Sequence, residues 1–200
     1  MSRGRSTLLV AATVLAVLGG GIAPAAACGL EDPSSVGVLR GTLNLAFPES
    51  LHVGTAVWQA QLSGRLPRDL VAQRADLSPE ARGQMRLIQA TLAMRRLAAA
   101  LAMDAPTAGR PVLAVVLVGP VLWTRIEPGA PAAEAQVHAA GPEPGDMVLV
   151  TESVTAEALS SGALGVDEAL QLGLLRLYGP ATDANAALHW LRGTLRGPRT

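Results

Sequence analysis

The 200-residue sequence has no lysine, one cysteine and few aromatic residues, and each scarcity narrows what the protein can be. All 16 basic residues are arginines, and they balance 16 acidic residues, so the formal net charge is zero. A neutral chain without basic runs lacks the electrostatic footprint of a nucleic-acid-binding protein, so we exclude that class. It also lacks the polybasic cluster that holds anionic lipid head groups.

Familiar catalytic and metal-binding patterns are missing too. The three histidines are far apart, and none stands in a metal-spaced pair. No nucleophile elbow, phosphate-binding loop or dinucleotide fingerprint occurs. Met85, Met94 and Met103 recur every nine residues and so alternate between opposite sides of a helix, which suits core packing better than a copper site. We therefore expect a non-enzymatic protein with no cofactor and no bound metal.

The amino terminus has the pattern of a cleavable signal peptide. Arg3 and Arg5 precede an uncharged apolar run at residues 8–18, and three alanines at 25–27 satisfy the small-residue rule for cleavage. The apolar run is shorter than the roughly 20 residues that span a bilayer, and no other stretch is long and apolar enough to span one. Residues 1–27 are therefore predicted to be a signal peptide of an exported protein.

Cys28, the only cysteine, is the first residue after the predicted cut. One interpretation is an ordinary cleavage site that happens to leave a cysteine. The other is a bacterial lipoprotein whose terminal cysteine is acylated, which would also remove a thiol that oxidation would otherwise threaten. Both stay open, and they place the protein either in the periplasm or on a lipid anchor in the envelope.

Residues 28–77 predict a small helical extension. A first helix begins near Val36 and stops at Pro48, and a second runs through residues 49–63 and ends near Gly64.

The second helix has Leu51, either Val57 or Trp58, and Leu62 at helical spacings. An exposed apolar face around Phe47, Leu51 and Trp58 would suit docking to another envelope protein. The extension therefore offers a partner-binding surface.

The clearest helix begins at Ser78, which is an N-cap serine followed by proline and an acidic residue in the first turn. This helix is apolar on two opposite sides. Such a helix is sandwiched, either inside the fold or between the protein and a ligand.

After this helix the pattern changes to short β-branched runs. Strands are predicted at residues 111–118, 121–126, 133–140, 147–152 and 174–178. The glycine- and proline-rich stretch 141–145 reads as a hairpin loop. Short helices at 154–160 and 166–172 and a closing helix at 181–195 complete the chain. The order predicts an α+β fold, with an antiparallel sheet of about five strands covered by helices over residues 78–200.

Residues 159–179, LSSGALGVDEALQLGLLRLYG, resemble the carboxy-terminal half of the sterol carrier protein 2 (SCP2) domain. The resemblance is carried by Gly162, Ala169, Gly173 and Gly179. In that family a small helix ends at a glycine, a second helix holds a buried alanine, and a further glycine leads into an edge strand.

The resemblance implies a five-stranded sheet covered by helices, with an apolar tunnel for a lipid or other hydrophobic small molecule and no catalytic residue. The candidate lining residues are Met85, Ile88, Leu92, Met94, Leu97 and Trp123.

Three functions are consistent with the sequence. The first is an exported carrier of a hydrophobic ligand, and the second is a structural or assembly partner of another envelope protein, which would have an exposed apolar face and no internal cavity. The third is a metal or redox accessory protein. Contact with the membrane is expected only through a lipid anchor on Cys28.

Overall fold

The computed structural model describes residues 33–69, 71, 73–102, 109–131 and 134–198. The predicted signal peptide and Cys28 lie outside these residues. Within them, no helix combines the length and the apolar character needed to cross a bilayer.

A five-stranded mixed sheet forms the centre of the fold, which confirms the α+β prediction. Its strands are β1 (Leu113–Leu117), β2 (Leu122–Ile126), β3 (Gln136–Ala139), β4 (Met147–Thr151) and β5 (Arg176–Tyr178), in the order β3-β2-β1-β4-β5. Neighbouring strands are antiparallel except β1 and β4, which run parallel with Leu113 beside Met147.

The parallel pair corrects the expectation of a hairpin at residues 141–145. This loop leaves the edge strand β3 and delivers the chain to the far side of β1, where β4 pairs. All five residues of β1 and of β4 are buried. Uniformly apolar strands of this kind are typical of the centre of a sheet that is covered on both faces.

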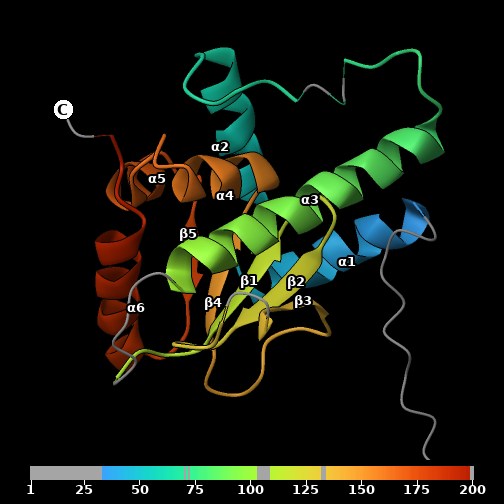
Figure 1. The fold of residues 1–200 in the computed structure, drawn as a ribbon. Coiled ribbons are helices and arrows are strands. Elements are labelled where there is room, and N and C mark those ends of the chain that lie inside the picture. The colour runs from blue at the N-terminus through green and yellow to red at the C-terminus, as the bar shows by residue number, and fades with distance from the viewer. Residues whose placement is uncertain (1–32, 70, 72, 103–108, 132–133, 199–200) are drawn as a thin grey trace, which may run out of the picture.

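The long helix α3 (Pro79–Ala102) crosses in front of the strands in Figure 1. Helix α4 (Ser153–Ser160) packs along α3, and α6 (Ala181–Thr194) contacts both α3 and β4. The short helix α5 (Val166–Gln171) packs against α6. The hydroxyl of Ser78 accepts a hydrogen bond from the amide of Ala81, so the predicted N-cap is confirmed. Ala98 and Leu101 of α3 meet Ile126 of β2 and Trp190 of α6 across this face.

The amino-terminal helices α1 (Pro33–Ala46) and α2 (Ser50–Leu62) cover the opposite face, and α1 is seen behind the strands in Figure 1. Phe47, between the two helices, packs against Trp123 of β2 and Tyr178 of β5, with ring centroids 5.9 and 5.4 Å apart. The Tyr178 hydroxyl donates a hydrogen bond to the Pro48 carbonyl. The amino-terminal helices therefore form the second covering layer of the sheet, and their buried side chains belong to the same hydrophobic core as the strands.

The residues that carry the SCP2 resemblance have local structural roles. Gly173 has a φ of 71° and Gly179 a φ of 146°, conformations that side chains disfavour. A Cβ on Gly179 would lie 2.5 Å from the Met147 sulfur. Ala169 is fully buried. Local backbone conformation and packing explain why glycine stands at 173 and 179 and alanine at 169. Membership of the family stays a prediction.

Candidate functional site

The six residues predicted to line a ligand tunnel do not come together. Met94 and Leu97 are fully buried in the core under α3. Ile88 and Leu92, on the other side of the same helix, are 57% and 44% exposed, and Met85 is half-buried. Trp123 lies on the opposite face of the sheet, against Phe47. The two apolar sides of α3 therefore face the core and the solvent, and they enclose no shared site.

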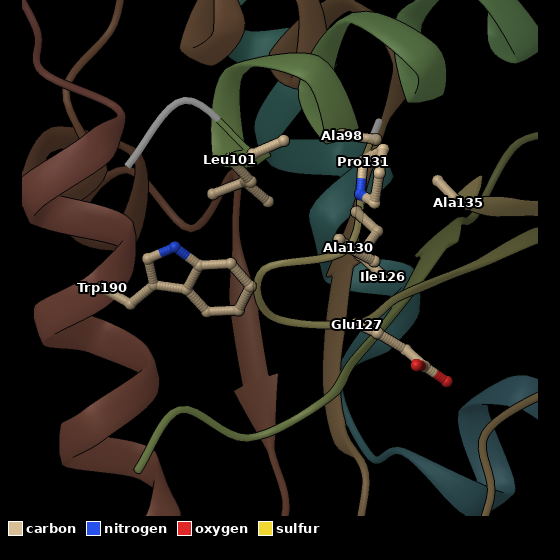
Figure 2. A pocket seen from close by; sticks show the side chains of 9 residues that line it. Ala98, Leu101, Ile126, Glu127, Ala130, Pro131, Ala135 and Trp190 are labelled. Carbon is tan, nitrogen blue, oxygen red and sulfur yellow. The ribbon is translucent and has the colours of Figure 1, made fainter. Parts of the chain in front are cut away.

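The hollow between α3, β2 and α6 is too small for a lipid. Figure 2 shows Leu101, Ile126 and Trp190 around it, and the enclosed space is about 10 Å³. That is room for about one water molecule. Sites for drug-sized apolar ligands take roughly 300–1,000 Å³. The guanidinium of Arg110 lies 5.4 Å from the Trp190 ring, which further fills this end of the sheet.

A second depression lies between α3 and α4, but it is open to solvent and partly polar. It has a volume of about 420 Å³ and is lined by Arg96, Ala99, Ala100, Glu157, Ser160 and Ser161. An Arg96–Glu157 ion pair crosses it. A shallow groove that contains an ion pair lacks the dry, concave walls that an apolar ligand needs.

The outer side of α2 is the most distinctive surface of the molecule. Leu51, Trp58 and Leu62 are 41%, 60% and 58% exposed, and Thr55, on the same side of the helix, is also exposed. Positions 51, 55, 58 and 62 are spaced by four, three and four residues, which is the spacing of a helix–helix seam. We call these four residues the α2 stripe.

The opposite side of α2 is apolar as well and packs on the sheet. Val53 is fully buried, and Val57 and Ala60 are buried beside it. None of the 13 residues of α2 is charged. The helix is therefore apolar on two sides, with the exposed polar side chains of His52 and Gln59 between them. One apolar side is covered by the sheet, and the α2 stripe on the other side is left in solvent.

Helix α1 adds two exposed apolar side chains to the same layer. Leu45 is 84% exposed and Val38 is 70% exposed, and they stand seven residues apart on one side of the helix. Phe47, which the sequence predicts on the exposed docking face, is instead half-buried between Trp123 and Tyr178. The structure thus keeps Leu51 and Trp58 on an exposed surface and adds Thr55 and Leu62.

Glu152 is an acidic residue whose pKa is raised by burial. Burial raises its pKa from the ordinary 4.5 to about 6, against the opposing effects of hydrogen bonds from the Gly119 and Ser153 amides and the charge of Arg40. Arg40 itself donates hydrogen bonds to the carbonyls of Val118 and Gly119. This cluster joins α1 to the β1–β2 turn and to the start of α4. It has no nucleophile, so we assign it a structural role.

Within the described ranges, no group of three or more histidine, cysteine, aspartate or glutamate side chains is placed to hold a metal ion. Comparison of the chain with protein-family models, with curated proteins and with solved structures gave no match. The fold and the exposed α2 stripe therefore define the protein only as an α+β domain with an uncovered apolar helix.

Proposed function

We propose that this chain is a non-enzymatic docking protein of the bacterial cell envelope that binds an apolar helix of a partner polypeptide through the α2 stripe. The observation that carries the proposal is the exposed, uncharged outer side of α2, with Trp58 at its centre. Tryptophan is enriched among the residues that dominate binding energy at protein interfaces. The heptad-like spacing of the stripe matches an elongated helical partner better than a compact ligand.

Carriage of a hydrophobic ligand has less support. A carrier needs an internal cavity, and the hollow between α3 and α6 has room for about one water molecule. The residues expected to line a tunnel face the core, the solvent and the opposite face of the sheet. In the part of the chain that the structure describes, the exposed apolar face of α2 and the small hollow between α3 and α6 support a docking protein over a carrier.

Photo-crosslinking in the producing cell tests the proposal. A photoreactive residue at Thr55 lies within the α2 stripe and leaves its three large apolar side chains in place, whereas one at the exposed Gln89 of α3 is the control. We expect a discrete polypeptide adduct from position 55, lost when Leu62→Arg is added, and none from position 89.

Two outcomes would contradict docking. One is an adduct at position 55 that contains lipid and no polypeptide. The other is a stoichiometric apolar molecule that remains on the purified chain in native mass spectrometry, which would restore the carrier function.

A further inference from the structure

The first half of α1 has little contact with the rest of the molecule. Residues 37–42 are six consecutive exposed positions, and Val36 before them is half-buried. A surface helix of a globular protein normally turns an apolar side, repeated every three to four residues, toward the core. In this stretch even the apolar Val38 is 70% exposed. Packing on the core therefore does little to hold residues 36–42, which we call the α1 arm.

The end of α1 is held differently. Leu43 is buried in the core. The side-chain oxygen of Asn44 accepts hydrogen bonds from the Ser50 hydroxyl and the Leu51 amide, both of 3.3 Å. Phe47, just beyond the helix, packs against two aromatic rings of the sheet. Helix α1 is thus anchored at its carboxyl end, and the α1 arm extends from that anchor.

The sequence of the α1 arm also makes its helix weak. The arm contains Gly37 and Gly41, and a glycine makes a helical position about fourfold to fivefold less favourable than an alanine does. A Cβ added to either glycine would meet nothing within 4 Å, so close packing does not require glycine at these positions. A helical segment this short is marginal in water without tertiary contacts.

Arg40 connects the α1 arm to the sheet. Its Nε donates hydrogen bonds of 3.1 and 3.0 Å to the carbonyls of Val118 and Gly119, and its Nη2 also donates to Gly119. The Glu152 carboxyl group lies at the same turn, 3.0 Å from where a Cβ of Gly119 would be, and the charge of Arg40 acts on it. Among the described residues, Arg40 is the side chain of the arm that is hydrogen-bonded to another element.

We infer that the α1 arm is a releasable clasp, which is helical while Arg40 binds the β1–β2 turn and unfolds locally when these bonds break, with Leu43 and the sheet staying in place. Segments with few buried contacts open locally at a low free energy, and switching between order and disorder is a common conformational device. Release uncovers the Val118 and Gly119 carbonyls and leaves Glu152 without its neighbouring cation. This inference is independent of docking through the α2 stripe.

Native-state hydrogen exchange of the purified chain, followed by mass spectrometry at pH 7, tests the clasp. We expect the amides of residues 37–42 to exchange more slowly than in an unfolded reference but at least about 100-fold faster than those of α2. Low concentrations of urea should leave the exchange rate of the arm nearly unchanged, because local opening exposes little surface.

Arg40→Met tests the connection itself. Methionine keeps a long side chain and a similar helix propensity but has no hydrogen-bond donor. Exchange in residues 37–42 should become about tenfold faster, whereas exchange in α2 should not change. Arg95→Met, at an exposed arginine of α3, is the matched control and should leave both rates as they are.

The pair Gly37→Ala and Gly41→Ala tests the weakness of the helix. Exchange in the arm should become about 20-fold slower, because each alanine favours the helical form. Gly54→Ala in α2, where an added Cβ also meets nothing within 4 Å, is the control and should leave the exchange of the arm unchanged.

Three results would overturn the clasp. Equal exchange rates in the arm and in α2 would show that the arm unfolds only with the whole molecule. Rates equal to those of the unfolded reference would show that nothing holds the arm. An unchanged rate in Arg40→Met would show that Arg40 does not connect the arm to the turn.

Discussion

Helices α2 and α3 lie on opposite faces of the sheet, and both leave apolar side chains in solvent. On α3, the exposed Ile88 and Leu92 stand among Arg86, Arg95 and Arg96. On α2, the exposed Trp58 and Leu62 have no charged neighbour on the helix. Single exposed apolar residues are normal on a soluble protein, whereas a continuous uncharged row marks an interaction site. The difference teaches that the charges around an apolar side chain, more than its exposure, distinguish a solvent face from a docking face.

The inner sides of the two helices are alike, since both pack on the sheet. Met94 and Leu97 of α3 and Val53 of α2 are fully buried. The contrast between the helices therefore concerns only their outer sides, and substitutions on inner and outer sides should separate stability from binding.

The largest loss of stability is expected for Leu97→Ala, and Leu92→Ala on the same helix is its comparison. Leu97 is fully buried and Leu92 is 44% exposed, so the first change leaves a cavity and the second does not. We expect Leu97→Ala to lower the free energy of unfolding by about 2–5 kcal/mol and Leu92→Ala by under about 1 kcal/mol. Urea denaturation followed by circular dichroism measures both. Equal losses would mean that the outer side of α3 is covered in the native protein, which would remove the contrast with α2.

A somewhat smaller effect is expected for Phe47→Ala, which tests how firmly the amino-terminal layer is held. Phe47 is half-buried and contacts the rings of Trp123 and Tyr178. The free energy of unfolding should fall by about 2–3 kcal/mol, below the value for a fully buried phenylalanine. Phe47→Leu, which keeps apolar volume but loses the ring contacts, should lose about 1 kcal/mol.

Near-ultraviolet circular dichroism should report the loss of order around Trp123 in the alanine variant. If Phe47→Ala unfolds at the same urea concentration as the original chain, the layer of α1 and α2 is a loosely attached extension and not part of the common core.

The sequence predicted the elements well because helices and strands are specified by local periodicity and by their end residues. Ser78 and Pro79 marked the start of α3, and Gly64, with a φ of 76°, follows α2 as expected. The parallel pairing of β1 with β4 was missed, because a strand's own residues do not name its neighbour. Both strands are buried along their whole length because they lie at the centre of the sheet. An apolar run in the sequence is consistent with a central strand but does not identify its neighbours.

The site was only partly predictable for the same reason. Leu51 and Trp58 were found from helical spacing, but α2 and α3 are each apolar on two sides. Spacing alone does not tell which side packs on the sheet, so Ile88 and Leu92 were grouped with Met94 and Leu97. Phe47 was assigned to the exposed face because its aromatic partners, Trp123 and Tyr178, lie far away in the sequence.

The smallest expected effect is a pH dependence of stability that comes from Glu152. This residue lies where α4, on one face of the sheet, approaches α1, on the other. Glu152 begins α4, on one face of the sheet, and its charge faces Arg40 of α1, on the other. Burial raises its pKa from 4.5 to about 6, so the folded chain holds this proton more tightly than the unfolded chain does. Between these pH values the folded state binds more protons, and its stability therefore falls as pH rises. The difference of about 1.5 pKa units corresponds to at most about 2 kcal/mol.

Glu152→Gln removes the titrating group, so the variant should match the original chain near pH 4 and exceed its stability above pH 6. Urea denaturation at a series of pH values measures the difference between the two chains. That difference isolates Glu152 from Glu168, whose pKa is lowered by its hydrogen bond from Arg65 and which contributes the opposite slope in both chains. Glu134→Gln, at an exposed position, is the control and should follow the original profile. A constant difference across the series would mean that water reaches Glu152, and α1 would then be held to the sheet by its apolar contacts and by the bonds from Arg40 to the β1–β2 turn.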